Sequence, residues 1–157
     1  MIGSGLQTDD VRDLYRELIL DHARNPRHFG KLDHTTHSAE GINPLCGDKL
    51  KLYLDVGSDE TIRDAAFEGS GCAISVASAS LLTDAVIGLS SDDAMVFFYT
   101  VTAQLSGSDV VDEQVELGKL QALTGVRDYP SRVKCATLAW HALKSALRQD
   151  NKPASTE

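Results

Sequence analysis

Three cysteines and one aspartate are the residues of this chain with the most specific chemistry. They are Cys46 and Asp48 in Pro-Leu-Cys-Gly-Asp, Cys72 after Gly-Ser-Gly, and Cys135 in Arg-Val-Lys-Cys-Ala-Thr, and the chain has no other cysteine. Three thiolates and a carboxylate make a four-ligand set for one soft or borderline metal ion. The sequence therefore predicts a metal site built from these four side chains.

The local setting of each thiol supports this interpretation. Cys46 and Asp48 are two residues apart with a glycine between them, so both fall on one side of an extended segment. Cys72 precedes a predicted helix, whose dipole favours a thiolate at that end. Lys134 lies next to Cys135, and its positive charge is expected to favour a thiolate there too.

The alternative interpretation is that the three cysteines are small core residues, because free cysteine is among the most buried residue types. Gly47, Gly69 and Gly71 argue against it, since they give the thiols turn chemistry that core cysteines do not need. Four protein ligands leave no open position on a tetrahedral ion, which disfavours hydrolysis by zinc-bound water. The five histidines have no paired metal spacing, and none is predicted as a ligand. The thiolate-rich set suggests sulfur chemistry through ligand exchange, or a metal cluster.

Size and charge restrict the classes of function. A chain of 157 residues suits one domain with one core. The net charge of −8 disfavours nucleic acid as a partner, because phosphate binding needs clustered lysine and arginine. The first ten residues lack the basic and apolar regions of a secretory signal, and no apolar stretch suits a membrane span. We therefore expect a cytoplasmic protein with reduced thiols and no membrane association.

The hydrophobic pattern predicts an α+β domain in which a small three-stranded antiparallel sheet packs against helices. A Gly-Ser-Asp turn at 57–59 favours a hairpin between the second and third strands. Residues 1–149 are expected to form the single domain, and residues 150–157 a flexible C-terminal tail. The predicted strands are 38–43, 50–56 and 62–67, and the predicted helices are 9–24, 74–86, 90–105, 115–122 and 131–147.

Several motifs together resemble the IscU/NifU-like iron–sulfur cluster assembly proteins. These motifs are Pro-Leu-Cys-Gly-Asp at 44–48, Gly-Ser-Gly-Cys-Ala-Ile-Ser at 69–75 and Lys-Cys-Ala-Thr-Leu at 134–138, with Leu-Tyr-Arg and Asp-His-Ala-Arg-Asn-Pro-Arg in the first helix. The resemblance runs from about Leu14 to Leu147, nearly the whole chain. Ala23 departs from it, since that position is often aromatic in the family, but this concerns helix packing more than the site.

Two features are similar to the SufU branch of that family rather than to its scaffold branch. The scaffold branch has a histidine directly before the last cysteine, whereas this chain has Lys134, whose ammonium cannot ligate a metal. The segment between Cys72 and Cys135 is also longer, with residues 107–125 as the extra piece.

The SufU resemblance implies a zinc-dependent sulfurtransferase. Its Zn²⁺ ion would be held by Cys46, Asp48, Cys72 and Cys135. Cys46 would leave the Zn²⁺ ion and accept persulfide sulfur from a SufS-like cysteine desulfurase, for use by downstream iron–sulfur assembly proteins. Two alternatives remain at this point: a scaffold that assembles and transfers a [2Fe–2S] cluster or iron on the same ligands, and a purely structural zinc domain. Whether the chain is an enzyme depends on which of these holds.

Other candidate residues receive weaker assignments. Arg132 lies three residues before Cys135, on the same helix face, and is predicted to orient Cys46 or a persulfide anion; an ordinary surface arginine is the alternative. Ser75, Ser78 and Ser80 are expected to serve close helix packing, because no His–Asp relay accompanies them. Trp140 is expected in the core.

Overall fold

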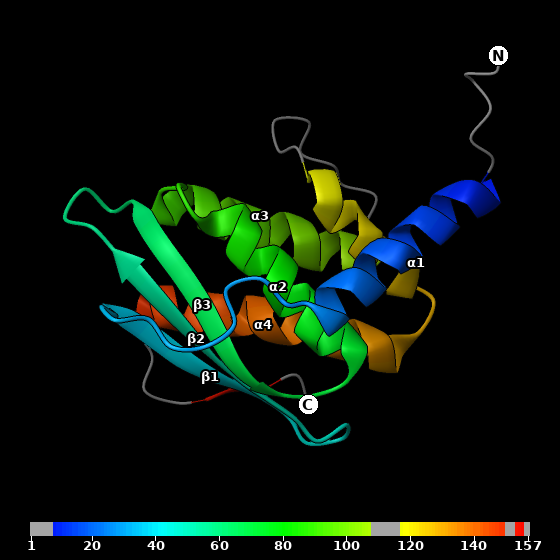
Figure 1. Ribbon diagram of the computed structural model, residues 1–157, viewed down its shortest axis with the longest axis horizontal. Helices are drawn as coiled ribbons and strands as arrows, with labels where there is room; N and C mark the ends of the chain where they lie inside the picture. Colours follow the sequence, from blue (N-terminus) through cyan, green and yellow to red (C-terminus); the bar gives the residue numbers. More distant parts are fainter. Residues whose placement is uncertain (1–7, 108–116, 150–152, 156–157) are drawn as a thin grey trace, which may run out of the picture.

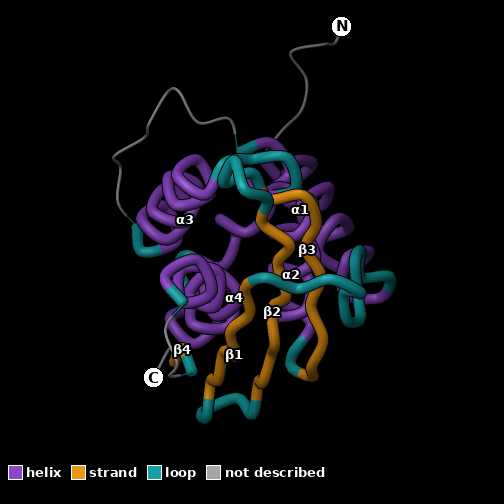
Figure 2. Tube along the Cα trace, turned by 90° about the vertical axis from the view of Figure 1, so that its left-hand side faces the viewer, coloured by secondary structure: helices purple, strands orange, loops and turns teal. Residues whose placement is uncertain are grey.

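A four-stranded sheet with helices packed against it forms the domain in the computed structural model, which describes residues 8–107, 117–149 and 153–155. The α+β class expected from the sequence is confirmed. Figures 1 and 2 show α2, α3 and α4 gathered on the same side of the sheet. The elements in chain order are α1 (Thr8–Arg24), β1 (His37–Asn43), β2 (Asp48–Val56), β3 (Ile62–Ser70), α2 (Ala73–Val86), α3 (Ser91–Leu105), η2 (Gly118–Val126), α4 (Pro130–Arg148) and β4 (Ala154–Ser155).

The sheet has the order β3-β2-β1-β4, and its first three strands are antiparallel as predicted. Side chains alternate across it, so that Leu50, Leu52 and Leu54 of β2 all face the core. The three predicted antiparallel strands are all present, and β4 adds a short fourth strand that runs parallel to β1 beside Gly41. A two-residue strand carries no hydrophobic period, so periodicity could not have revealed it.

The helices agree with the sequence prediction to within a few residues, except for the segment expected at 115–122. There the structure forms a 3₁₀ helix, η2, from Gly118 to Val126. The rest of the extra piece at 107–125, from 108 to 116, lies outside the described residues. Of the tail expected to be flexible, 150–152 and 156–157 also lie outside them, and Ala154–Ser155 is β4.

Packing between helices and sheet fixes the positions of the elements that carry the site. Helix α4 packs on β1 and β2, while α2 packs on β3, α4 and α1. Trp140 is fully buried, as expected, and its Nε1–H donates to Ser78 Oγ over 3.2 Å. Ser78 in turn donates to the Ala136 carbonyl oxygen, so the buried serines of α2 do serve close packing against α4.

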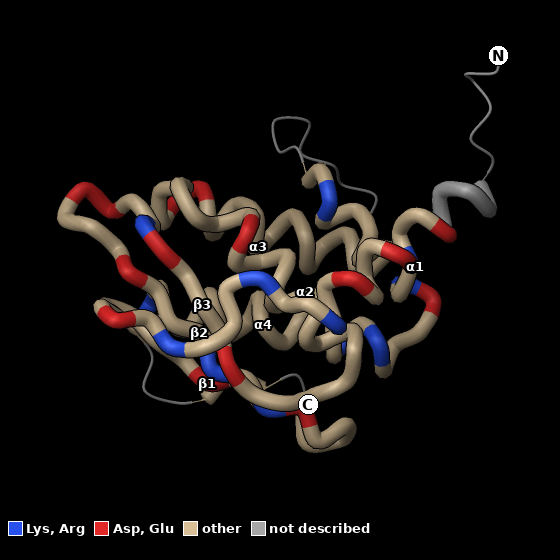
Figure 3. Tube along the Cα trace, viewed as in Figure 1, with Lys and Arg blue, Asp and Glu red and all other residues tan. Residues whose placement is uncertain are grey.

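Charged residues of both signs are interspersed over the face seen in Figure 3, along the strands and around α1. Arg27 forms an ion pair with Asp21, in which Nη2 and Oδ2 lie 2.6 Å apart. Within the described part of the chain, no helix is both long enough and apolar enough to span a membrane.

Candidate metal centre

The turn between β1 and β2 presents Cys46 and anchors Asp48. The Cys46 N–H donates to the Asn43 carbonyl oxygen over 3.2 Å, which closes the turn. Gly47 has a φ of +72°, a left-handed conformation that favours glycine. Asp48 is the first residue of β2, directly opposite Asn43 in the register. Cys46 is exposed whereas Asp48 is buried, so the two side chains meet very different surroundings.

The start of α2 presents Cys72. Cys72 is the N-cap residue of that helix, as expected, and its Sγ accepts a hydrogen bond from the Ser75 N–H over 3.5 Å. Gly71 precedes it without room for a side chain, because an added Cβ would lie 2.7 Å from Asp48 Oδ1. The start of α2 is therefore packed directly against the carboxylate at the start of β2.

Asp48 is held by hydrogen bonds at both carboxylate oxygens. The Cys72 backbone N–H donates to Oδ1 over 2.8 Å, and Ser75 Oγ donates to Oδ2 over 2.7 Å. Asn43 Nδ2 lies 3.4 Å from the same Oδ2. The carboxylate is thus fixed in place before any ligand arrives.

Cys135 approaches from α4, with its thiol buried in the core. Its Sγ lies 3.6 Å from Cys46 Sγ. Burial raises the pKa of the Cys135 thiol strongly, and the neighbouring Cys72 thiol and Asp48 carboxylate raise it further. The expectation that Lys134 acidifies this thiol is therefore wrong for the free protein: desolvation outweighs the lysine. A bound cation would reverse the effect, since it favours the thiolate.

Three of the four predicted ligands come together. One ligand atom each from Cys46, Asp48 and Cys135 lies within 4.8 Å of the other two. Cys72 Sγ is not part of that group, but Cys72 lines the same cleft of about 310 Å³ as Cys46 and Cys135. The donor set fits a zinc ion in kind, because thiolate sulfur and carboxylate oxygen are both zinc ligands.

Arg132 lies in the first turn of α4 and lines this same cleft. Its guanidinium carbon lies 4.5 Å from the centre of the Tyr129 ring, a cation–π contact that fixes the side chain beside the opening. The position is compatible with the predicted role toward Cys46.

Comparison with known proteins gives the family. The model of the NifU-like N terminal domain matches residues 14–136, well over half of the chain. The chain belongs to this family. It is 41% identical over 139 residues to the iron–sulfur cluster assembly scaffold protein IscU of Streptococcus pyogenes serotype M1, a match that covers 88% of this chain and 86% of the relative.

A second relative in the family carries a different functional name. The zinc-dependent sulfurtransferase SufU of Bacillus subtilis strain 168 is 39% identical over 137 residues, covering 87% of this chain and 91% of the relative. The crystal structure of the N-terminal part of a nitrogen-fixing NifU-like protein from Brucella abortus superposes with a TM-score of 0.78 at 27% identity, covering 88% and 95%. The fold and the place of the chain in iron–sulfur cluster assembly are therefore established, whereas identity does not separate scaffold from sulfurtransferase.

Two residues that contact the ligands were missed or only partly understood from the sequence. Ser75 was expected to pack only, yet it donates to Asp48 and also to the Cys135 carbonyl oxygen, over 3.3 Å. Asn43, fully buried, was not singled out. The signal that could have found Asn43 is its position directly before the Pro-Leu-Cys-Gly-Asp turn, where a buried amide must find partners.

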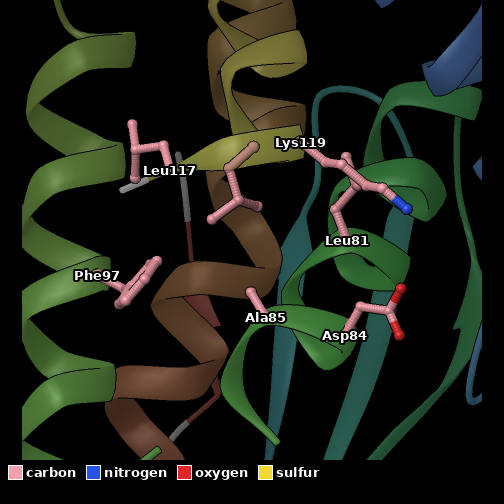
Figure 4. Close-up of a pocket in the computed structure, with 7 residues that line it drawn as sticks. Leu81, Asp84, Ala85, Phe97, Leu117 and Lys119 are labelled. Atoms are coloured by element: carbon pink, nitrogen blue, oxygen red, sulfur yellow. The ribbon is translucent and has the colours of Figure 1, made fainter. Parts of the chain in front are cut away.

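A second pocket of about 300 Å³ lies between α2, α3 and η2 (Figure 4). Its lining is mostly aliphatic and aromatic, with the charged groups of Asp84 and Lys119 beside it. None of its described lining residues is a cysteine or histidine, so sulfur or soft-metal chemistry belongs to the cysteine cleft.

Proposed function

We propose that this protein is a zinc-dependent sulfur acceptor that takes persulfide sulfur from a cysteine desulfurase for iron–sulfur cluster assembly. One observation carries the proposal: an exposed thiol, Cys46, and a buried thiol, Cys135, line one cleft, and the buried Asp48 carboxylate lies close to both. The arrangement combines buried groups that can retain a metal with an exposed thiol that a partner can reach. The Bacillus subtilis relative is named for this activity.

Cys46, Asp48, Cys72 and Cys135 would hold the zinc ion. When bound, zinc keeps its cysteine ligands as thiolates and protects them from oxidation until a partner arrives. That contribution matters most at Cys135, where burial raises the pKa of the thiol in the free protein. Asp48 is held in position by hydrogen bonds from the Cys72 N–H and the Ser75 hydroxyl.

The transfer step is an exchange between two sulfur–sulfur bonds. The Cys46 thiolate attacks the terminal sulfur of the partner's cysteine persulfide, forming a new persulfide on Cys46. The original sulfur–sulfur bond breaks and its electron pair stays on the partner's cysteine, which leaves as a thiolate. No net oxidation or reduction occurs, so no further reactant is required. Cys46 suits this role because its side chain is exposed on a turn rather than anchored in the core.

Arg132 is proposed to orient the Cys46 sulfur or the persulfide anion in the cleft. Arg132 lines the same cleft as Cys46, and its guanidinium lies over the Tyr129 ring. A cation there stabilises the negative charge that the incoming persulfide carries. We expect Arg132→Ala to slow sulfur transfer while leaving zinc affinity within about twofold of the parent, because the described contact of the Arg132 side chain is with the Tyr129 ring and not with a proposed ligand. Unchanged transfer in this variant would make Arg132 an ordinary surface residue.

The second candidate function is a scaffold that assembles and transfers a [2Fe–2S] cluster. The same cysteines suit it, because cysteinate binds iron as readily as zinc. The 41% identity to a relative named as such a scaffold favours it. Lys134 disfavours it, since the histidine expected before the last cysteine in the scaffold branch is absent here.

Cysteine desulfurase turnover in the presence of this protein tests the proposal. We would compare the zinc-loaded protein, the zinc-stripped protein and Cys46→Ala, and follow sulfur on Cys46 by the mass increase of its peptide. The proposal expects stimulation that requires both zinc and Cys46. No stimulation, with a coloured cluster forming when iron is supplied under anaerobic conditions, would instead support the scaffold.

Cys135→Ser serves as the matched variant. It removes a buried ligand but leaves the Cys46 thiol in place, so it separates loss of zinc from loss of the acceptor sulfur. A purely structural zinc domain would behave differently: Cys46→Ala would lower the melting temperature without any specific loss of sulfur transfer, because no sulfur passes through Cys46.

A further inference from the structure

Asn43 contacts three of the four proposed ligand residues, although it is not itself a ligand. It is the last residue of β1 and is fully buried. Its carbonyl oxygen accepts the Cys46 N–H, and its side-chain Nδ2 lies 3.4 Å from Asp48 Oδ2 and 3.6 Å from Cys135 Sγ. Ser75 also contacts three of these residues, but its contact with Cys135 is to the carbonyl oxygen, whereas Asn43 reaches the Cys135 sulfur.

The orientation of the Asn43 amide follows from its neighbours. If the amide were turned over, its oxygen would face the Asp48 carboxylate, and two acceptors would repel each other. The donor therefore points toward Asp48 and Cys135. The amide oxygen, Asn43 Oδ1, is left buried with no hydrogen-bond partner among the described residues. Such an unpaired buried acceptor costs stability, and it is the kind of exception that a functional requirement explains.

The cysteine sulfurs differ in the N–H donors that reach them. Cys135 Sγ has the Asn43 amide, and Cys72 Sγ has the Ser75 backbone N–H. Cys46 Sγ has neither: within the part of the chain that the structure describes, its hydrogen bond comes from the Cys135 thiol, a proton that ligation would remove. An N–H donor stabilises a thiolate and lowers its tendency to leave or to attack.

We propose that Asn43 is the positioning residue that makes Cys46, and not Cys135, the ligand that leaves the metal. Its amide holds the Cys135 thiolate and the Asp48 carboxylate in place, while the Cys46 thiolate keeps its full nucleophilicity. This proposal rests on the proposed function for its biological purpose, but it concerns ligand lability, which is measured without any sulfur transfer.

The test uses Asn43→Leu, which has a similar volume and no donor, in the full-length chain loaded with zinc or with cobalt. Ser78→Ala is the matched control, because it removes buried hydrogen bonds between α2 and α4 without touching a ligand. The first measurement is iodoacetamide alkylation of the zinc-loaded proteins, resolved by peptide mass spectrometry into rates at Cys46 and Cys135. The second is the sulfur-to-cobalt charge-transfer absorption.

In the parent and in Ser78→Ala we expect Cys46 to be alkylated much faster than Cys135. In Asn43→Leu the ratio of the Cys135 rate to the Cys46 rate should rise about tenfold, the effect of losing one hydrogen bond to a charged group. The charge-transfer band should move to longer wavelength, because a thiolate without its donor gives up an electron more easily.

A merely structural role gives a different pattern. If Asn43→Leu only loosened the packing, the ratio of the Cys135 rate to the Cys46 rate would rise equally in the metal-free protein. The charge-transfer band of the cobalt-loaded Asn43→Leu protein would then have the same wavelength as that of Ser78→Ala. Either result would overturn the proposal. Failure of the proposed function is separate, since it would show as absent desulfurase stimulation in the parent protein while the alkylation ratio and the cobalt band still report on Asn43.

Discussion

The substitution Gly71→Ala tests whether the start of α2 positions the Asp48 carboxylate. An added Cβ would lie 2.7 Å from Asp48 Oδ1 and 3.1 Å from its carboxyl carbon. The first distance is about 0.7 Å less than the 3.4 Å at which ordinary contact begins, so one partner must move. The backbone of Gly71 does not adopt the left-handed conformation, so the strain that alanine introduces comes from the collision with Asp48 and not from its φ.

The magnitude follows from what Asp48 would lose. Its carboxylate is buried and fixed by Cys72 and Ser75, so a shift of this size breaks at least one of those hydrogen bonds. Overpacking of this kind costs about 1–3 kcal/mol of stability in the metal-free protein. A metal ligand must be held within about 0.5 Å, and loss of a supporting contact typically weakens metal binding 10- to 100-fold, or about 1.4–2.7 kcal/mol.

Zinc affinity would be measured by competition with a chromophoric chelator, with urea unfolding of the metal-free protein alongside. Gly125→Ala is the matched control, since that glycine has open space around its Cβ position and no left-handed φ. We expect the control to bind zinc as the parent does and to be stabilised by about 0.4–1 kcal/mol at most. If Gly71→Ala bound zinc within about twofold of the parent, the reasoning that Asp48 is a positioned ligand would be refuted.

Three further substitutions give predictions at residues that are not proposed ligands. Ser78→Ala leaves the buried Trp140 Nε1–H without its acceptor, so we expect a loss of about 1–3 kcal/mol in urea unfolding with zinc affinity unchanged. Burial lowers the pKa of His22 below its ordinary value of 6.5, so the unfolded chain binds that proton more readily. The melting temperature of the metal-free protein should therefore fall as the pH drops below 6.5, and His22→Gln should reduce that slope. Gly69 has a φ of +134°, and in Gly69→Ala the new Cβ would collide with the Lys49 carbonyl oxygen. We expect the free energy of unfolding to fall by at least about 3 kcal/mol, or no folded protein to form, as measured by circular dichroism.

Much of the fold follows from patterns that are local in the sequence. Alternating Leu50, Leu52 and Leu54 identify β2 because one face of that strand is buried. Ser90 marks the start of α3, where its side chain accepts the Asp93 N–H. The exceptions are segments with no local pattern: η2 is a 3₁₀ helix that hydrophobic periodicity cannot distinguish from an α-helix, and β4 is set by contact with β1 rather than by its own residues.

The metal site likewise has some features that are local in the sequence and others that depend on the fold. The residue types and turn glycines around the cysteines identify the candidate ligands, because these are local features. Burial is not local, and it reversed the expectation for Cys135: the neighbouring Lys134 is visible in the sequence, whereas the apolar surroundings that raise the pKa of the thiol appear only in the fold. Asn43 and Ser75 act on the ligands across β1, β2 and α2, and such contacts between elements cannot be deduced from spacing.

The two candidate roles use the same ligand residues, so ligand identity cannot separate them, and neither can identities of 41% and 39% to relatives with different names. A physical difference can. A sulfur acceptor needs one ligand that exchanges while the others keep the metal, which requires unequal ligands. A scaffold must hold its cluster through all its cysteines until transfer, which favours more equal ones. Here the ligands are unequal, since Cys46 is exposed on a turn while Cys135 and Asp48 are buried and hydrogen-bonded. This inequality is the physical reason to prefer the sulfur acceptor, and the alkylation rates of Cys46 and Cys135 measure it directly.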